Sequence, residues 1–426
     1  IHSFPTRRSS DLGQQPLKHA TSQIAAYCLF DAPVAEVHVR VAEHVVDGTE
    51  CVFIDLSNED REVVKVTGEG WSIVQEPPVF FRRTRSQNPL PTPERGGSLD
   101  LLRQYVRMSE DNFCLLLAWM VQCFNPTGPY PVLGIFGEQG SGKSTLTRMV
   151  KAILDPSPLD TRDLSSSVRD LTIAADNSWV LSFDNNSGMS AELSDALCRL
   201  STGGAFSTRT LYKNREEDIF EAARPILING IEEVITRGDL ADRSIFIQLQ
   251  PIAKADRMPE HRLWSQFTDD LPLILGGILD AVSVALRRRD SIELDELPRM
   301  ADFAIWAQAA EPQLPVKEGL FESAYAANQE EAARILLNND PVALEIFCML
   351  QEQEDHEWEG TTSELREAIK MRFIDRDGLP RDYPKTPQAM TAYLRRTLPL
   401  LRLMKVQRET NIQHEKKRAF RLRLTG

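Results

Sequence analysis

Short apolar runs separated by polar turns dominate the first part of the chain. Between Glu36 and Arg83 the sequence contains five runs of β-branched and aromatic residues: EVHVRV, CVFIDL, EVVKV, WSIV and VFF. Runs of this length and composition, bounded by polar turns, are typical of β-strands. They predict a small β-rich unit. The stretch 85–97, RSQNPLPTPERGG, is rich in proline and glycine and predicts a linker.

The pattern changes in the middle of the chain. Residues 99–124 have the apolar spacing of a helix, and NPTGPY then interrupts it. Four continuous apolar runs further along predict strands that are buried on both faces. These runs are PVLGIF (131–136), WVLSF (179–183), PILIN (225–229) and SIFIQL (244–249). Segments long enough for helices separate them, as in a parallel sheet with helical crossovers, so the predicted fold class is α/β.

The last third of the chain is predicted to be mostly helical. Residues 258–340 have helical patterns throughout, and further helices are expected near 341–352, 361–372 and 386–402. Two strand candidates, KVQRE and RAFRLRL, follow them. These patterns divide the chain into a small β-rich domain, a core, a helical region and a last unit: 13–90, 91–257, 258–340 and 341–426.

The first residues of the chain need a separate explanation. Residues 1–12, IHSFPTRRSSDL, resemble a translated sequencing adapter fused to an open reading frame. We expect this stretch to be such an artefact, with the protein's own sequence beginning near Gly13. A disordered natural tail is the alternative. In either case we assign residues 1–12 no role.

The composition is that of a globular protein of two or three units, with 42% apolar and 26% charged residues in a chain of 426. No run of about eighteen apolar residues is present, so we expect neither a transmembrane helix nor a membrane partner. The six cysteines are scattered and form no CxxC pair, which indicates neither a zinc site nor a disulfide framework. We therefore expect reduced thiols and a cytoplasmic location.

Charge is distributed unevenly along the chain. The net charge of −13 argues against a protein coated with nucleic acid, although it says little about a local channel. The C-terminal stretch is basic by contrast, with only Glu409 and Glu415 opposing its cations. These cations are Arg395, Arg396, Arg402, Lys405, Arg408, Lys416, Lys417, Arg418, Arg421 and Arg423.

The most specific motif is a glycine-rich loop. GEQGSGKS matches G-x-x-x-x-G-K-[ST] and stands between a predicted strand and a predicted helix, as that motif requires. Its glycines let the backbone turn tightly and direct N–H groups at phosphate oxygens, while Lys143 supplies positive charge and Ser144 a hydroxyl for Mg²⁺. We therefore predict a site for ATP and Mg²⁺; a glycine turn with an incidental lysine is the alternative. The predicted ATP-binding residues are Gly137, Glu138, Gln139, Gly140, Ser141, Gly142, Lys143, Ser144 and Thr145.

Two polar residues end later strands. Asp184 is predicted to hold the Mg²⁺ together with Ser144, because ligands of open α/β sheets bind at the carboxyl ends of the strands. Asn229 is predicted to orient the attacking water. The alternative for both residues is a turn at the end of a strand.

A candidate arginine finger follows in GDLADRSIFIQL. We predict that Arg243 reaches the γ-phosphate of a neighbouring subunit, with Arg237 as its substitute. The alternative is a surface ion pair of Arg243 with Asp239 or Asp242.

The order of these elements resembles superfamily 3 helicases, which are AAA+-type hexameric ATPases of viruses, phages and plasmids. The shared order is the glycine loop, the strand with Asp184, a polar segment and the strand ending in Asn229. The likeness extends from about Pro77 to the C-terminus. It is nearest to phage and poxvirus-type primase-helicases and to ATP-binding proteins of prophages and integrative elements. It implies a P-loop NTPase core, a homohexamer, and a pore hairpin that carries Arg209 and Lys213 to single-stranded DNA.

The sequence departs from that family at one position. The family usually places a second acid beside the metal-binding one, where it activates water, and here Asn185 stands in that place. Asparagine can orient water but cannot take its proton. Either Glu232 or Glu233 supplies the base, or hydrolysis depends on positioning alone. ATP binding is therefore better supported than fast turnover.

The tail from about Gly360 resembles the winged-helix unit that closes many such proteins. In that likeness TPQAMTAYLRRTLPLLRLM is the recognition helix and RAFRLRL is a wing strand. A basic helix and a basic wing fit contacts with duplex DNA phosphates. A compact helical cap with solubilising arginines is the alternative. The β-rich unit before Pro91 has no recognisable set of primase acids.

Three functions are compatible with these features. The resemblance implies an ATP-driven DNA helicase or translocase that serves replication of a phage, plasmid or integrative element. An ATP-binding regulatory switch that associates with DNA without unwinding it is the alternative. A small-molecule kinase is the weakest, because it requires neither a pore hairpin nor a basic tail.

Overall fold

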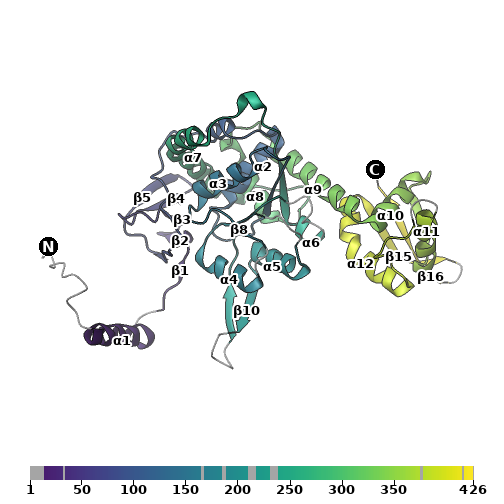
Figure 1. Cartoon of the computed structure of the whole chain (residues 1–426), viewed down its shortest axis with the longest axis horizontal. Coiled ribbons are helices and arrows are strands. Elements are labelled where there is room, and N and C mark those ends of the chain that lie inside the picture. Colours follow the sequence, from purple (N-terminus) through teal and green to yellow (C-terminus); the bar gives the residue numbers. More distant parts are fainter. Residues whose placement is uncertain are drawn as a thin grey trace.

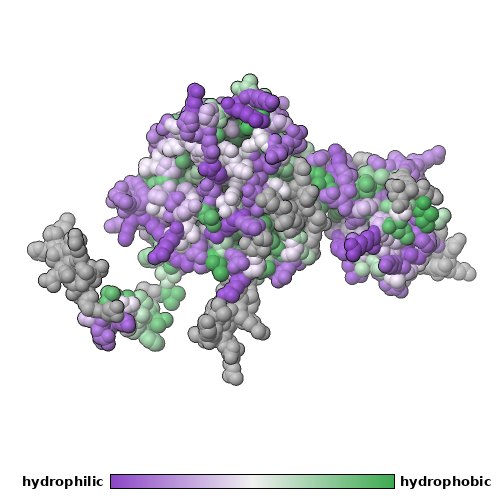
Figure 2. Space-filling model, viewed as in Figure 1, coloured by the Kyte–Doolittle hydropathy of each residue, from purple (hydrophilic) through white to green (hydrophobic). Residues whose placement is uncertain are grey.

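The molecule has a large body, a smaller C-terminal unit and a helix that lies apart from the body (Figure 1). Helix α9 (Leu320–Asn339) leads from the body to the C-terminal unit, and α1 (Gln14–Phe30) is the separate helix. Figure 2 shows a mainly hydrophilic face on the body, whereas α1 carries exposed apolar side chains. Among the described residues, no helix combines the length and the apolar character of a membrane span. This computed structural model describes residues 14–31, 34–164, 167–184, 189–209, 217–230, 238–374, 378–414 and 417–425.

The four apolar runs of the middle region form strands of one parallel sheet, as predicted. A fifth strand of two residues completes the sheet, and the order of strands is β13-β7-β12-β9-β8. The bounds are β7 (Val132–Phe136), β8 (Arg162–Asp163), β9 (Leu181–Asp184), β12 (Ile226–Asn229) and β13 (Ser244–Gln248). The predicted class, α/β with a parallel sheet, is confirmed.

Helices cover both faces of this sheet, and the strands supply alternate side chains to the two layers. In β7, Leu133 and Ile135 belong to one core, whereas Val132 and Phe136 belong to the other, as the two-residue period of a strand requires. The first layer contains α2 (Glu110–Gln122), α3 (Lys143–Leu154), α7 (Glu260–Arg288) and α8 (Ala301–Ala310). The second layer contains α4 (Val168–Asn177), α5 (Ala191–Thr202) and α6 (Gly238–Ala241).

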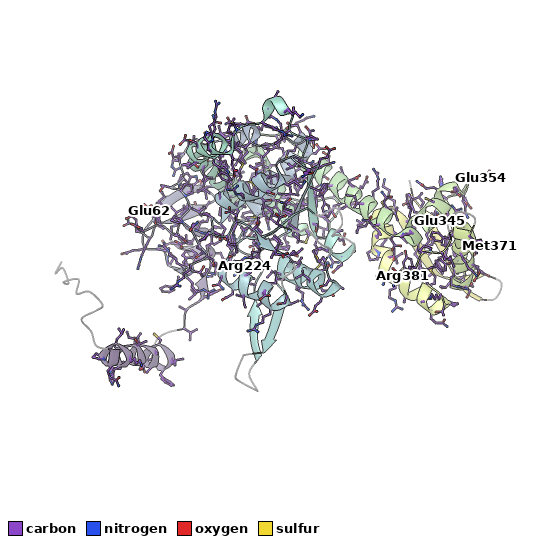
Figure 3. The ribbon with its side chains drawn as sticks, viewed as in Figure 1. Glu62, Arg224, Glu345, Glu354, Met371 and Arg381 are labelled. Carbon is purple, nitrogen blue, oxygen red and sulfur yellow. The ribbon has the colours of Figure 1, made fainter. Side chains whose placement is uncertain are left out.

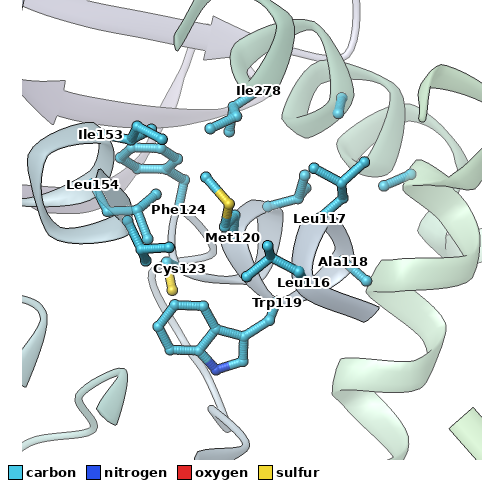
Figure 4. Close-up of a cluster of buried hydrophobic side chains, with 14 of the residues drawn as sticks. Leu116, Leu117, Ala118, Trp119, Met120, Cys123, Phe124, Ile153, Leu154 and Ile278 are labelled. Atoms are coloured by element: carbon cyan, nitrogen blue, oxygen red, sulfur yellow. The ribbon is translucent and has the colours of Figure 1, made fainter. Parts of the chain in front are cut away.

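Helix α2 occupies the centre of the larger core. Figure 4 shows Met120 of α2 close to Ile153 of α3 and Ile278 of α7. Trp119 is fully buried, and its Nε1 donates to the carbonyl oxygen of Pro131 at 2.7 Å, so its polar edge is satisfied. This helix is apolar on every side because every side of it is covered.

The helical pattern predicted over 99–124 is divided in the structure. A 3₁₀ helix, η2 (Leu99–Gln104), comes first, and a break separates it from α2. The side chain of Ser109 accepts a hydrogen bond from Asn112 N and so caps the start of α2.

The predicted β-rich unit is a four-stranded antiparallel sheet in the order β2-β3-β4-β5. One face of this sheet packs on α7: Trp71 Nε1 donates to Asp280 at 2.9 Å, and Ser283 Oγ donates to Thr67 O at 2.7 Å. The apolar residues of this face therefore belong to the same core as α2 and β7, whereas those of the other face form a small cluster of their own. The strands are β2 (Val41–Val46), β3 (Thr49–Asp55), β4 (Val63–Thr67) and β5 (Gly70–Val74), and a separate parallel pair is formed by β1 (Val37–His38) and β6 (Phe80–Phe81).

The segment 85–97 contains no helix or strand, but it is packed closely against α7. A Cβ on Gly97 would lie 1.8 Å from Leu273 O, and a Cβ on Gly276 would lie 1.8 Å from Glu94 O. Glycine at both positions therefore lets the two backbones touch. Because the β-rich sheet, this segment and α7 share contacts, the core of the body extends across the predicted domain boundaries.

The C-terminal unit has a core of its own. Its three-stranded antiparallel sheet has the order β14-β16-β15. All predicted helices and strands of this region are present, whereas β14 was not predicted. The unit joins the body through α9 and α12, since Leu337 belongs to its core and Leu400 belongs to the core of the body. The elements are α10 (Pro341–Glu352), β14 (Glu357–Gly360), α11 (Thr362–Ile374), α12 (Pro387–Leu403), β15 (Val406–His414) and β16 (Lys417–Leu424).

A buried network of charged groups connects the N-terminal sheet, α3 and β9. Asp155 accepts from Arg40 Nε at 3.0 Å and from Lys151 Nζ at 2.8 Å, and all three side chains are almost completely buried. The same carboxylate accepts from the backbone N–H groups of Trp179 and Val180 at 3.0 and 3.1 Å. Burial by itself raises the pKa of Asp155, but the charges of Lys151 and Arg40 and these hydrogen bonds hold that pKa below its usual value, so the carboxylate is ionised.

We expect Asp155→Asn to lower the free energy of unfolding by about 3–5 kcal/mol. The substitution leaves Arg40 and Lys151 buried without a counter-charge. Denaturant unfolding followed by tryptophan fluorescence measures the loss. The control is Asp100→Asn, which removes an exposed partner of Arg103 and is expected to cost less than about 1 kcal/mol. Equal unfolding midpoints for the two variants would contradict this role of Asp155.

Candidate functional site

A glycine-rich loop joins β7 to α3 at the carboxyl edge of the parallel sheet. Gly137, Gly140 and Gly142 have φ angles of 149°, 83° and 89°, which residues with a side chain rarely adopt. A Cβ on Gly137 would also lie 2.8 Å from Leu249 O, so space requires glycine there as well. The loop ends at Lys143, the first residue of α3, and the first turn of a helix has N–H groups free to bind an anion.

Lys143 is half-buried and folds back onto its own loop. Its Nζ donates to Gly137 O at 2.5 Å and to Glu138 O at 3.0 Å. No carboxylate pairs with it in the part of the chain that the structure describes. The ammonium group is therefore held by neutral carbonyl oxygens, and an anion at the loop would bind it more strongly than they do.

Asp184 and Asn229 end neighbouring strands at the same edge as this loop. In the parallel register Asn229 of β12 lies beside Ile135 of β7 on one side and beside Asp184 of β9 on the other. Because neighbouring strands are about 4.8 Å apart, Asp184 is about 10 Å from the end of β7. The structure thus brings the glycine loop, Asn229 and Asp184 together.

Asn229 contacts the first turn of α3 directly. It is 2% exposed, and its Nδ2 donates to Ser144 Oγ at 3.2 Å. Its Oδ1 is buried and has no hydrogen-bond donor among the described residues. An unsatisfied buried acceptor is costly, so this oxygen is ready to accept a hydrogen bond from a bound molecule.

Asp184 and Ser144 are the predicted oxygen donors for a divalent cation at this edge. Asp184 is half-buried and Ser144 is exposed, so both are accessible. Within the described ranges no three His, Cys, Asp or Glu side chains gather into a metal site. Mg²⁺ does not require such a cluster, because it keeps several waters and takes one or two protein ligands together with phosphate oxygens. The pair therefore fits Mg²⁺ that arrives with a nucleotide.

Arg243 lies at the opposite edge of the sheet. It precedes β13, and its carbonyl oxygen accepts from Val132 N, at the start of β7, at 2.9 Å. From Val132 to Phe136 the strand rises about 13 Å, so Arg243 does not reach the glycine loop of its own chain. Its guanidinium forms an ion pair with Asp239, which is one of the two predicted alternatives.

Arg243 also lines a cavity of about 780 Å³ at this edge. Arg289 and Arg299 line the same cavity, together with Asp290 and Asp302. The cavity is therefore mixed in charge, with one more arginine than carboxylate among these five side chains.

The predicted DNA-contacting hairpin is present in part. Strand β10 (Ala205–Arg209) pairs with β11 (Glu217–Glu221) in antiparallel register, and the two strands project from the body (Figure 1). Arg209 is the last residue of β10. Some predicted site residues lie outside the described part of the chain: Asn185, Lys213, Glu232, Glu233 and Arg237.

One cation beside the loop was not found by sequence reasoning. The Nη2 atom of Arg257 lies 3.7 Å from the position of a Cβ on Gly140. Arg257 stands in an irregular segment after β13, far from the loop in sequence. No local motif marks it, because only the tertiary fold brings it to Gly140.

Family models match most of the chain. A model described as actinomycete integrative conjugative element replication protein matches residues 99–328, which is more than half of the sequence. This chain belongs to that family. The match contains the glycine loop and the strands that end in Asp184 and Asn229. A second model, described as AICE RepA C-terminal domain, matches residues 342–425 of this replication protein. The expectation of a replication protein from a mobile element is confirmed.

The similarity of this chain to solved structures is weaker. The A form apo structure of the NrS-1 C-terminal region has a TM-score of 0.38 and 12% identity, and the match covers 99% of this replication protein and 93% of that chain. A second apo structure of the NrS-1 C-terminal region has a TM-score of 0.38 and 11% identity, with coverage of 97% and 100%. A comparison with curated proteins gave no match.

Two arginines of β16 in the C-terminal sheet are neutralised by carboxylates. Arg421 forms ion pairs with Glu359 at 2.8 Å and with Glu409 at 3.4 Å. Arg423 pairs with Glu357. These arginines of the replication protein are therefore not free cations of a basic wing.

Helix α12 carries three cations without an ion pair. Arg395, Arg396 and Arg402 are exposed, and none of them has an ion pair among the described residues. Helix α11 shows the contrast, since its Arg372 is held by Glu345 of α10, which is labelled in Figure 3. Helix α12 therefore presents three unpaired arginines, and within the described residues Arg381 and Lys385, which precede it, are exposed and unpaired as well.

Proposed function

We propose that this replication protein is a cytoplasmic ATPase that moves along DNA or unwinds it during replication of its integrative element. The observation that carries the proposal is the arrangement of four residues at one edge of the sheet. Lys143 and Ser144 begin the helix after the glycine loop, and Asp184 and Asn229 end the two neighbouring strands. These are the residue types that bind a nucleotide phosphate tail and its Mg²⁺.

In this proposal the loop amides and the first turn of α3 bind the β- and γ-phosphates. Lys143 exchanges the carbonyl oxygens of Gly137 and Glu138 for phosphate oxygens, a charge-assisted contact that is stronger than the one it replaces. Ser144 and Asp184 hold Mg²⁺. When bound, that ion neutralises charge on the phosphate oxygens as the reaction proceeds.

In this proposal Asn229 orients the attacking water. Its Nδ2 is committed to Ser144 Oγ, which leaves the unpartnered Oδ1 as an acceptor beside the phosphate-binding loop. Asparagine does not take a proton, so it contributes position alone. A base has to come from another residue, and Glu232 and Glu233 remain the predicted ones, with Asn185 as a second group that orients water.

Arg243 acts on a neighbouring subunit in this proposal. Its place at the far edge of the sheet supports an action on the nucleotide of another copy, as in the homohexamer that the resemblance implies. In the single chain Asp239 neutralises the guanidinium, and the phosphates of a neighbour compete for it.

DNA contacts two regions in this proposal. Arg209 and Lys213 of the β10–β11 hairpin contact single-stranded DNA in a central pore. The C-terminal unit contacts duplex DNA through α12. Its order of elements, helix-strand-helix-helix-strand-strand, supports a winged-helix fold in which α12 enters the major groove.

A regulatory switch that binds ATP and DNA without unwinding is the second candidate. The observation that favours it is Asn185, which stands where the resembling family usually has a second acid. Without that acid, slow hydrolysis would leave the protein in its ATP-bound form for longer. The rate of ATP hydrolysis in the presence of DNA separates the two candidates.

We expect single-stranded DNA to stimulate ATP hydrolysis by the wild-type protein. We expect Lys143→Ala to abolish hydrolysis and to weaken Mg–ATP binding at least about tenfold, because one charge-assisted hydrogen bond to the nucleotide is lost. Lys317→Ala, which alters an exposed lysine with no hydrogen bond or ion pair to the loop among the described residues, is the control and is expected to behave as wild type. Hydrolysis that does not respond to DNA would favour the switch. Wild-type protein that binds no ATP would exclude both candidates.

We expect Arg243→Ala to bind ATP normally but to hydrolyse it at least about 10³-fold more slowly, because an arginine finger stabilises charge in the transition state. Mixing this variant with Lys143→Ala is expected to restore part of the activity. The Lys143→Ala subunit then supplies its Arg243 to the intact loop of the variant beside it. No recovery at any mixing ratio would count against action between subunits.

We expect the double substitution Arg395→Ala with Arg396→Ala to weaken duplex DNA binding. The slope of log K against log salt should fall in magnitude by about 2, since each lost phosphate contact removes about 0.9. Arg421→Ala with Arg423→Ala changes the net charge equally but removes arginines that are already paired. If both double variants lose the same affinity, α12 is not the DNA-binding face.

A further inference from the structure

The segment 249–259, which follows β13, runs beside the glycine loop. It contains only one 3₁₀ turn, η3 (Lys254–Asp256), and no strand. Three glycines of the loop each face it at contact distance. The pairs are Gly137 with Leu249, Gly142 with Ile252, and Gly140 with Arg257. One short segment therefore contacts the loop at three of its glycines, while Glu138, Gln139 and Gly140 of the loop stay exposed.

Both ends of this segment are anchored to the elements that flank the loop. At its start, Leu249 N donates to Phe136 O at 2.8 Å and so continues the pairing of β13 with β7. Just past its end, Glu260 of α7 accepts from Arg148 Nη1 of α3 at 2.6 Å. Arg148 also lies over the ring of Trp264, at 4.7 Å from the centroid. The segment therefore stays beside the loop unless one of these contacts breaks.

Arg257 is the cation that this segment brings to the loop. Its side chain is exposed, and it has no hydrogen bond or ion pair within the described part of the chain. Arg148 differs from it, because Asp160 and Glu260 already neutralise that guanidinium. An arginine fork binds two phosphate oxygens at once, whereas a lysine acts as a single point charge.

The loop needs such a charge. The phosphate tail of a nucleoside triphosphate carries several negative charges, and Lys143 is the cation that the loop itself contributes. We propose that Arg257 is a phosphate ligand supplied in cis, which closes over the β- and γ-phosphates of a nucleotide held in the glycine loop. The inference builds on the proposed function, because it takes the loop to be the nucleotide site.

A phosphate ligand and a merely covering residue predict different nucleotide preferences. A guanidinium that binds the β- and γ-phosphates contributes most to ATP, less to ADP and nothing to AMP. A residue that only shapes the segment affects all three nucleotides alike. The ratio of these affinities therefore identifies the role without any measurement of hydrolysis.

The test compares wild-type protein with Arg257→Ala, Arg257→Lys and Lys254→Ala by titration calorimetry with Mg–ATP, Mg–ADP and AMP. Lys254 is an exposed cation on the same segment and has no partner among the described residues, so it is the matched control. We expect Arg257→Ala to weaken Mg–ATP binding about tenfold or more, as for the loss of a charged hydrogen bond, with a smaller loss for Mg–ADP and none for AMP. Arg257→Lys should recover part of the loss, and Lys254→Ala should match wild type.

Two results would overturn the inference. In the first, Arg257→Ala binds all three nucleotides as wild type does. In the second, it loses the same factor for each of them. Thermal unfolding of every variant shows whether the fold is intact. If wild-type protein itself binds no ATP, both the proposed function and this inference fail. If wild-type protein binds ATP and Arg257→Ala binds it equally well, only the role of Arg257 fails.

Discussion

The carboxylate of Asp155 is the contact on which the geometry of the candidate site depends. It stands one residue beyond α3, and it accepts the N–H groups of Trp179 and Val180, which lead into β9. Helix α3 begins at Lys143, and β9 ends at Asp184. The elements that carry the loop lysine and the strand-end acid are therefore tied together at their far ends. Helix α3 is about 18 Å long, so a small change in the direction of its axis at the Asp155 end displaces Lys143 at the other end.

Arg40 extends the same constraint to the N-terminal sheet. Besides Asp155 it donates to Asp55 O, Ser57 Oγ and Asn88 O, so its guanidinium is satisfied although it is completely buried. A buried ion pair is weak evidence for net stability, because desolvation offsets much of the attraction. What this network provides is a single arrangement, since any shift of the sheet against α3 leaves a charged group unpaired. The N-terminal sheet is thus part of the support of the site and not an appendage.

Sequence reasoning succeeded where a local pattern carries the information. A strand buried on both faces must be continuously apolar, so the polar residue after such a run falls at the edge of the sheet, and Asp184 and Asn229 were found in this way. Strand β14 was missed because EWEG has no strand pattern of its own and becomes a strand only by pairing with β16. The ion pair of Arg421 with Glu359 joins residues 62 positions apart and leaves no local signal. The roles of Asp155 and Arg257 were also missed, because each depends on contacts with residues distant in the sequence.

In the proposed ATPase, the nucleotide-binding residues and Arg243 lie at opposite edges of the sheet. Leu400 of α12 packs in the same core as Leu240 of α6, the four-residue helix that precedes Arg243. Asp239, which holds the guanidinium of Arg243, belongs to that same helix. A displacement of α12 by DNA would therefore act on α6 and on the ion pair that restrains Arg243. In the proposed function, DNA would thus act on Arg243 along a path that does not include the glycine loop with Lys143, which lies at the other edge.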